Sequence, residues 1–277
     1  MARMLAISSQ VARGHVGLSA IVPALQALGH EVIALPTVLL SNHPGHAHVA
    51  GQRIAPVHLR RMLAALSGNN WLGEVDAVLT GYLPSLEHVA FAVEAVRAVR
   101  DANPHAVVLV DPILGDDPKG LYIDVHAAHV IKRDLLPLAS GIKLNAFELG
   151  WLSGHRIESS QDAAFAVTEM RWPATVATSV PSSPGFIETV FVEDGVRQAS
   201  YESKRLAGVP NGTGDLLAAL VLGHALKPDT TFAEAIQQAY AGVSLAARLS
   251  AGKPELQLIP HLQAIVTASI YKSCTAP

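Results

Sequence analysis

The sequence predicts an α/β protein with a central, mainly parallel sheet, helices on both faces and an antiparallel hairpin at one edge. Three observations predict it. Apolar, β-branched runs alternate with helical patterns over most of the 277 residues. The run at residues 106–111 (AVVLVD) is nearly all apolar, as expected for a strand covered on both faces. Two later strand-like runs flank Glu193-Asp194-Gly195, which is a strong hairpin signal.

The first part of the chain alternates strands and helices. Apolar runs predict strands at residues 4–8, 31–40, 75–80 and 106–111. Amphipathic patterns predict helices at residues 17–28, 56–66 and 85–101. Gly29 is suited to end the first helix, and Ser85 is suited to cap the third.

The second part of the chain continues the alternation and then becomes helical. Strands are predicted at residues 141–144, 174–179, 187–192 and 196–201. Helices are predicted at residues 124–136, 146–152, 161–171, 213–226, 232–249 and 261–270. The sequence contains no internal repeat, low-complexity segment or linker. We therefore expect a single domain over residues 1–277.

The composition excludes several functional classes. Charged residues make up 16% of the chain and the formal net charge is −3, so nothing predicts a nucleic-acid partner. No apolar run approaches the ~20 residues that span a bilayer, so no membrane partner is expected. The single cysteine, Cys274, cannot form an intrachain disulfide. These features together favour a cytoplasmic protein.

The segment Asn211-Gly212-Thr213-Gly214-Asp215 stands directly before an apolar helical run. Its two glycines allow a tight turn and close approach to a ligand. The first amides of the following helix have no partner inside the helix, and the helix dipole is positive there. This pattern predicts an anion site for a phosphoryl group in transfer, with Asp215 as acceptor of a hydroxyl proton. An ordinary glycine loop with an acidic first turn has the same spacing.

Acidic residues follow two neighbouring predicted strands. Asp111 ends the strand predicted at residues 106–111 and Asp116 follows it, and two acids at the carboxyl end of a strand suit a magnesium site, directly or through water. A common turn rich in Asp, Pro and Gly is the alternative. Asn145 and Glu148 follow the next strand with the spacing of a capping box, which alone explains them better than a metal site.

Three more polar loops follow predicted strands: SQVARGHVG at residues 9–17, SNHPGH at residues 41–46 and GYLPS at residues 81–85. Each alone is typical of a turn. Neither GxGxxG nor GxxxxGK[ST] is present, which speaks against a dinucleotide-dependent oxidoreductase. In open parallel sheets, ligands bind at the carboxyl ends of the strands, and nearly all of these loops fall there.

Taken together, these segments resemble the pyridoxal kinases of the ribokinase-like superfamily. The matching pieces, in order, are LAISSQVARGHVG, TVLLSNHPGHAH, GYLPS, DPILGD, KGLY, LNAFEL, ATSV, GTGDLLAALVLG and PELQLI, and they span residues 5–259. The resemblance implies a ribokinase-like three-layer α/β/α sandwich. It also implies an ATP-dependent enzyme that converts pyridoxal to pyridoxal 5′-phosphate, in vitamin B6 salvage.

The resemblance assigns roles around the alcohol. Asp215 would be the catalytic base, with the amides of Gly212, Thr213 and Gly214 as the anion hole. Five further residues would bind the substrate: Ser9, Val16, Thr37, His43 and Tyr82. Ser9 would hydrogen-bond the pyridine ring, and Val16 would supply an apolar wall. His43 and Tyr82 would pack on or contact the ring.

The resemblance also implies a nucleotide side with Mg2+ as cofactor, ATP as co-substrate and a monovalent cation as a further candidate. The residues concerned are Asp111 and Glu148 as metal ligands, and Asp116, Tyr122, Thr178 and Ser179 beside the phosphates or the nucleotide. Residues 204–211 would cover ATP, and a homodimer is expected.

Several residues depart from the family pattern. Gln10 stands where these kinases usually have His, Leu18 where Asn is frequent and Pro44 where Thr is common. Lys143-Leu144 replaces a Thr-Pro or Ala-Pro pair beside the metal region. A lysine there could substitute for a cation or repel one.

Other functions are weighed against this one. A kinase for hydroxymethylpyrimidine on the same fold is the nearest alternative, although its GTG motif is typically followed by Cys rather than Asp. A sugar or nucleoside kinase would carry an additional lid, for which there is no room before Val75. A non-catalytic protein that binds pyridoxal phosphate is the alternative from a different class.

Overall fold

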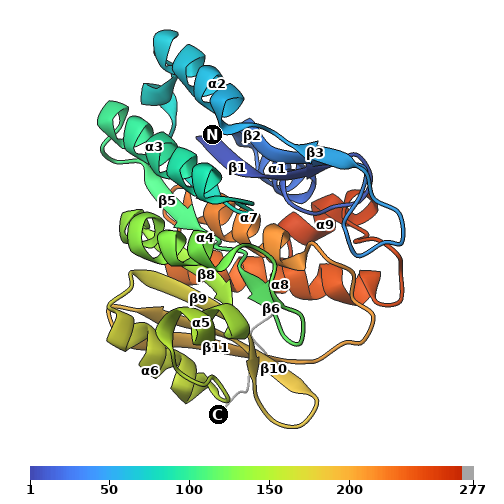
Figure 1. The fold of residues 1–277 in the computed structure, drawn as a ribbon. Coiled ribbons are helices and arrows are strands. Elements are labelled where there is room, and N and C mark those ends of the chain that lie inside the picture. The colour runs from blue at the N-terminus through green and yellow to red at the C-terminus, as the bar shows by residue number, and fades with distance from the viewer. Residues whose placement is uncertain (270–277) are drawn as a thin grey trace.

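A nine-stranded sheet forms the centre of the computed structural model, which describes residues 1–269 (Figure 1). The strand order is β11-β10-β9-β8-β5-β4-β1-β2-β3. The strands are β1 (Arg3–Val11), β2 (Glu31–Leu40), β3 (Gly51–Arg53), β4 (Ala77–Thr80), β5 (Val107–Val110), β8 (Gly141–Asn145), β9 (Ala174–Pro181), β10 (Phe186–Glu193) and β11 (Val196–Lys204). A separate small ladder pairs β6 (Gly115–Asp116) with β7 (Gly120–Leu121).

The six strands from β2 to β9 pair in parallel, as predicted. The β10–β11 hairpin is antiparallel and lies at one edge of the sheet, which confirms the hairpin prediction. At the opposite edge, β3 pairs antiparallel with β2. The sequence did not predict β3, because its three residues are exposed and carry no alternating apolar pattern.

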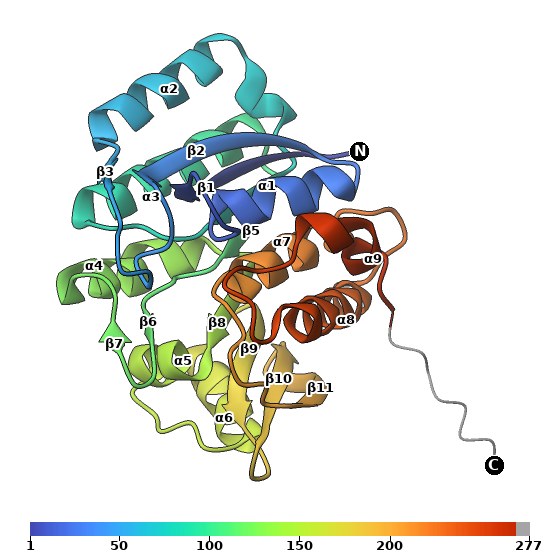
Figure 2. The ribbon, with the colours of Figure 1, turned by 90° about the vertical axis from the view of Figure 1, so that its right-hand side faces the viewer.

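Helices cover both faces of the sheet. One face carries α1 (Leu18–Ala27), α7 (Thr213–Ala225), α8 (Phe232–Ser250) and α9 (Leu262–Val266), which Figure 2 shows gathered on one side. The other face carries α2 (Pro56–Gly68), α3 (Leu86–Ala102), α4 (Val125–Val130), α5 (Ala146–Ser153) and α6 (Ser160–Met170). Short helices are η1 (Trp71–Glu74), η2 (Ile131–Leu135), η3 (Leu136–Leu138) and η4 (Ile259–His261).

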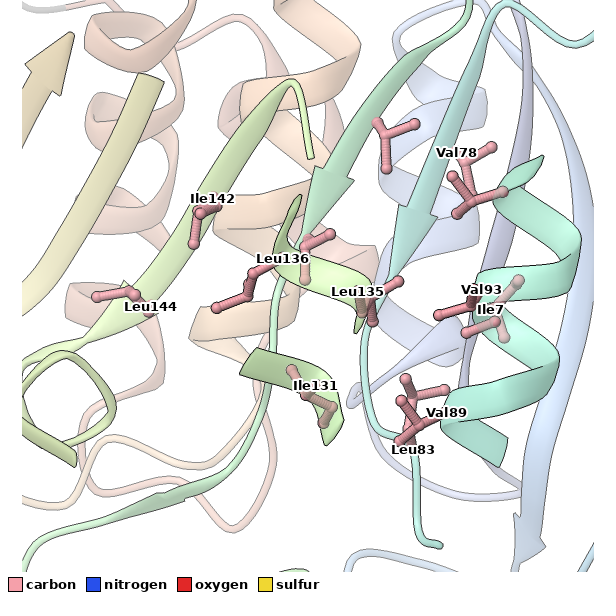
Figure 3. Close-up of a cluster of buried hydrophobic side chains, with 14 of the residues drawn as sticks. Ile7, Val78, Leu83, Val89, Val93, Ile131, Leu135, Leu136, Ile142 and Leu144 are labelled. Atoms are coloured by element: carbon pink, nitrogen blue, oxygen red, sulfur yellow. The ribbon is translucent and has the colours of Figure 1, made fainter. Parts of the chain in front are cut away.

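The all-apolar strands supply two separate cores, because successive side chains of a strand point to opposite faces. In β1, Leu5 and Ile7 join the core under α2 to α6, whereas Met4 and Ala6 join the core under α1, α7 and α8. Figure 3 shows Val93 of α3 beside Ile7 in the first of these cores. Burial on both faces is therefore the physical reason for the continuous hydrophobic runs.

Three local predictions differ from the structure. The helix predicted at residues 124–136 is divided into α4, the π-helix η2 and the 3-10 helix η3, and Pro137 cannot continue an α-helical hydrogen-bond pattern. Ser85 occupies the N-cap position of α3, but its hydroxyl donates to the Glu87 carboxylate at 2.6 Å instead of capping an amide. The helix predicted at residues 261–270 ends at Val266, and Cys274 lies outside the described residues.

The fold gathers the polar loops at one edge of the sheet. Parallel strands end at the same edge, so the loops after β1, β2, β4, β5, β8 and β9 lie there together. The start of α7 faces them. Within residues 1–269, no helix combines the length and apolar character needed to cross a membrane.

Candidate active site

The start of α7 is built for close contact with the loop after β1. Gly212 has a φ of +109°, and a Cβ on it would collide with the His15 carbonyl oxygen. Gly212 also occupies the N-cap position of α7 without any side-chain cap. The first amides of α7 therefore have no partner within the helix, and they form a positive, anion-binding end.

Asp215 lies in the first turn of α7 and is half-buried. Burial, aided by the negative charge of Asp111, raises the pKa of Asp215 to about 6, while a hydrogen bond from the Gly17 amide and the charge of Lys143 oppose the rise. The carboxylate is thus mostly ionised at neutral pH, yet is a stronger base than an ordinary aspartate. A group with these properties can accept the proton of an attacking hydroxyl.

Loops from both halves of the chain meet beside Asp215. A Cβ on Gly17 would collide with Ser9, which places Ser9 next to the amide that binds Asp215. Val16 is buried against Gly212, with its Cγ1 3.4 Å from the position of a Cβ there. The structure thus brings Ser9 and Val16 to the segment at residues 211–215 that precedes and begins α7. We call the loops at residues 9–17, 41–46 and 81–85 the ring side of the site.

The loop at residues 41–46 reaches the same region through His43. The side-chain nitrogen of Asn211 lies 3.2 Å from His43 Nδ1, and the Gly45 amide donates to that ring nitrogen at 2.9 Å. Burial lowers the pKa of His43, and the charges of Lys119 and His46 add to the effect. His43 is therefore neutral at pH 7, which suits contact with an uncharged ring.

Thr37 and Tyr82 are linked to each other. Thr37 is fully buried and its hydroxyl donates to the Tyr82 carbonyl oxygen at 2.8 Å. The Tyr82 amide donates to Ser8 Oγ at 3.1 Å. Thr37 thus fixes the backbone of the loop at residues 81–85, and it offers no exposed hydroxyl to a ligand.

Glu255 was not among the residues predicted for the site. It lies 3.1 Å from His46 Nε2, and a Cβ on Gly14 would approach its Oε2 to 2.6 Å. Glu255 therefore joins the C-terminal part of the chain to two ring-side loops. The only signal for it in the sequence was the segment PELQLI, which matched the family pattern without a residue role.

Opposite the ring side, a buried ion pair connects β5 to β8. Lys143 Nζ donates to Asp111 Oδ2 at 2.8 Å, and the two side chains are 6% and 3% exposed. The ammonium also lies against the start of α7, since a Cβ on Gly214 would be 2.9 Å from Nζ. We call Asp111, Lys143, Glu148 and the start of α7 the phosphoryl side.

The charge of this pair follows from its neighbours. Burial alone would lower the pKa of Lys143, but Asp111, Glu148 and Asp215 outweigh it and raise that pKa. Burial raises the pKa of Asp111, and the Lys143 ammonium opposes the rise. Lys143 is therefore a permanent positive charge at the centre of an acidic cluster.

Glu148 holds two loops together by its carboxylate. The capping box is present, because the Asn145 amide donates to Glu148 Oε2 and the Glu148 amide donates to Asn145 Oδ1, each at 2.8 Å. The Leu114 amide donates to Glu148 Oε1 at 2.8 Å. Burial, with the charge of Asp111, raises the pKa of Glu148 to about 7. Glu148 is thus a structural clamp on residues 111–116.

These contacts limit how a metal could bind. Asp111 Oδ1 and Asp116 Oδ1 are buried without a hydrogen-bond partner, so these two oxygens are available to accept from a bound ligand. They fit a hydrated magnesium ion that also contacts phosphates. Of the two ways in which the predicted ion could be held, directly or through water, these contacts favour water, because Lys143 lies on Asp111 and amides occupy Glu148. Residues 1–269 contain no cluster of three or more His, Cys, Asp or Glu suited to a metal.

The predicted nucleotide residues lie beyond this cluster. Burial and a hydrogen bond to Asp116 raise the pKa of Tyr122, whose ring is 5.8 Å from Lys119 Nζ. Thr178 pairs in register with Asn145, and its hydroxyl lies 3.3 Å from the Leu144 carbonyl oxygen. Ser179 is exposed next to it, with a φ of +56°. Such strained backbone often accompanies ligand sites.

Tyr122 also lines a cavity of about 210 Å³, together with Arg53 of β3 and Pro84 of the loop after β4. A second cavity of about 210 Å³, lined by Val107 and Phe232 among others, holds none of the predicted site residues. The chemistry of the side chains, and not the cavity size, therefore identifies the site.

Comparison with known proteins shows which family has this architecture. Residues 16–257 match the model of the phosphomethylpyrimidine kinase family. The pyridoxal kinase PdxY of Leifsonia xyli subsp. xyli is 35% identical over 266 residues, which cover 93% of each chain. Human pyridoxal kinase is 35% identical over 239 residues, which cover 79% of this chain and 76% of the human one.

Solved structures agree with these relatives. The pyridoxal kinase of Leishmania donovani in complex with ADP and pyridoxamine superimposes with a TM-score of 0.90 at 25% identity, over 97% of each chain. The pyridoxal kinase of Entamoeba histolytica gives a TM-score of 0.88 at 25% identity, over 96% of this chain and 95% of the other. The predicted ribokinase-like three-layer fold is thereby confirmed.

Proposed function

This chain belongs to the pyridoxal kinase family, and we propose that it transfers the γ-phosphoryl group of ATP to the 5′-hydroxymethyl oxygen of pyridoxal. The products are pyridoxal 5′-phosphate and ADP, and the reaction belongs to vitamin B6 salvage. One observation carries the chemistry: Asp215 stands beside the free amides of α7 and faces the Lys143–Asp111 pair.

Phosphoryl transfer requires positioning and charge neutralisation more than covalent chemistry. The substrate hydroxyl attacks the γ-phosphorus, the bond from that phosphorus to the β–γ bridging oxygen breaks, and the hydroxyl proton passes to Asp215. Gly212, Thr213 and Gly214 direct their amides at the phosphoryl oxygens. The charge that develops on the leaving ADP lies near the same positive helix end.

Magnesium enters this scheme with the nucleotide, as MgATP. It would neutralise phosphate charge, and Asp111 Oδ1 and Asp116 Oδ1 would hold it through water. Thr178 and Ser179 lie in β9, and Tyr122 follows the small β6–β7 ladder and is hydrogen-bonded to Asp116. Their contact with phosphates follows from the family resemblance and is part of the proposal.

The ring side supplies the slot for pyridoxal. A pyridine ring needs an apolar site with few polar anchors. Val16 offers the wall, Ser9 a hydroxyl next to Gly17, and His43 a neutral imidazole. Tyr82 is held beside them by the buried Thr37. Gln10, one of the departures from the family pattern, donates from Nε2 to Ser19 Oγ of α1 at 2.8 Å, so its side-chain amide is already hydrogen-bonded.

The direct test is Asp215→Asn with MgATP and pyridoxal. Turnover is expected to fall by about 10³-fold, because only the proton acceptor is lost. ATP binding, measured by calorimetry, is expected to remain. Asp229→Asn is the matched control, since Asp229 is exposed beyond the far end of the same helix. Unchanged turnover in Asp215→Asn, or an equal loss in the control, would exclude Asp215 as the base.

The matching family model favours one second candidate, a kinase acting on hydroxymethylpyrimidine. A panel of pyridoxal, pyridoxine, pyridoxamine and hydroxymethylpyrimidine with MgATP separates the two functions. Pyridoxal is expected to give the highest kcat/KM, with Asp215 in place of the Cys that is typical of the pyrimidine branch. A higher kcat/KM for hydroxymethylpyrimidine would reverse the assignment.

We also propose a homodimer that works in the cytoplasm, on the basis of the family resemblance. Light scattering after size-exclusion chromatography is expected to give twice the mass of one chain. A mass equal to that of one chain would contradict the dimer.

A further inference from the structure

Lys143 occupies an unusual place for a lysine. Its side chain is 6% exposed, its Nζ is 2.8 Å from Asp111 Oδ2, and Glu148 and Asp215 act on its charge as well. One carboxylate thus contacts the ammonium, and two more act on its charge. Lys143 is one of the positions at which the sequence departs from the family pattern.

The ammonium also lies against the positive end of α7. A cation at a helix N-terminus is unfavourable, and burial of an ion pair rarely stabilises a fold overall. The position of the Lys143 ammonium therefore needs an explanation other than stabilisation of the fold. Gly214 leaves room for it, since a Cβ there would lie 2.9 Å from Nζ. The ammonium and the free amides of α7 together form a strongly positive anion-binding site.

We propose that Lys143 is a built-in monovalent cation for phosphoryl transfer. Its ammonium, between Asp111 and the Gly212–Gly214 loop, takes the place that a bound potassium or ammonium ion would otherwise fill. An alkylammonium carries the same single charge and is close to these ions in size. The enzyme therefore turns over without added monovalent salt.

This inference rests on the proposed kinase function, but its test is independent of it. The wild-type enzyme is compared in tetramethylammonium chloride and in potassium chloride of equal ionic strength. Turnover with MgATP and pyridoxal is expected to change by less than about twofold, since the site already holds its cation. The thermal midpoint without substrates is expected to be the same in the two salts. Absence of turnover in both salts would refute the function and leave the thermal comparison valid.

Lys143→Ala is expected to convert the site into a cation-binding one. In tetramethylammonium, turnover should fall by about a hundredfold, and the thermal midpoint should drop by roughly 10 °C because Asp111 loses its partner. Added potassium or ammonium ions should raise the turnover and the thermal midpoint of this variant, and both effects should saturate with salt concentration. Lys227→Ala is the control, as Lys227 follows the far end of α7 and should show neither effect.

The double variant Asp111→Asn/Lys143→Ala covers the case in which Lys143→Ala does not fold. It removes both charges of the pair and is expected to fold without any saturable response to potassium. Two results would overturn the proposal. One is a wild-type enzyme that requires potassium for turnover or is thermally stabilised by it. The other is a folded Lys143→Ala variant that responds to potassium no more than Lys227→Ala does.

Discussion

The two sides of the site are held in different ways. On the phosphoryl side, Asp111, Lys143 and Glu148 are buried and are joined by an ion pair and by amide hydrogen bonds. On the ring side, the loop at residues 41–46 is largely exposed and meets the segment before α7 through the contact of His43 with Asn211.

This difference separates chemistry from substrate choice. Buried charges joined by an ion pair and by amide hydrogen bonds have few low-energy arrangements, which suits phosphoryl transfer because small displacements there are costly. Exposed loops with few contacts tolerate change and open more easily. We therefore expect substitutions on the phosphoryl side to alter stability and kcat, and substitutions on the ring side to alter mainly KM.

The largest effect is expected for Glu148→Gln. Glu148 accepts amide hydrogen bonds on both carboxylate oxygens, whereas glutamine would turn an NH2 group toward one of those amides. The loss is about 2–3 kcal/mol of unfolding free energy, measured by urea denaturation at pH 5, where the raised pKa of about 7 keeps the Glu148 carboxyl protonated in the folded state and its charge does not contribute.

Glu234→Gln is the matched control for that experiment. Glu234 completes a capping box with Thr231 at the start of α8, but it is exposed and holds no second loop. Its substitution should destabilise the protein much less. Equal losses in the two variants would mean that burial of the phosphoryl side has no energetic consequence.

The pH dependence is the next largest effect. Asp215 must be ionised to accept a proton, and its pKa is about 6. Below that value, kcat/KM for pyridoxal is expected to fall about tenfold per pH unit, or ~1.4 kcal/mol. The residual kcat/KM of Asp215→Asn should not show this fall at low pH.

Asp215 also affects stability, with the opposite sign. Its pKa is about 6 in the folded state and ~3.9 in the unfolded chain, so the folded state favours the protonated form. Stability from this group is present below pH 3.9 and is lost as pH rises to 6. At pH 8, Asp215→Asn should therefore be more stable than the wild type by about 1–2 kcal/mol, since the group is partly solvated. A less stable variant would contradict the raised pKa.

The smallest effect is expected on the ring side. Asn211→Ala removes the contact with His43 Nδ1. KM for pyridoxal should rise about fivefold, which corresponds to one hydrogen bond, with kcat and ATP binding unchanged. Asn69→Ala, at the exposed end of α2, is the control. A loss in kcat instead of KM would show that the two sides are not separable.

The capping box at Asn145 and Glu148 illustrates how far local sequence rules reach. Its spacing predicted the cap, and both hydrogen bonds are present. The family resemblance also made Glu148 a candidate metal ligand, but in the structure its carboxylate accepts from the amides of Leu114 and Asn145. The amide partner at Leu114 is 34 residues away in sequence, so no local pattern could reveal it.

The sequence by itself determined the alternation of strands and helices, the edge hairpin and the glycine loop before α7. These features follow from short-range effects: periodic burial, turn chemistry and the conformational freedom of glycine. Lys143 was visible only as a departure from a family pattern. Its meeting with Asp111 and Gly214 was decided by the tertiary structure, because strand register and the packing of α7 choose which side chains share one face of the sheet.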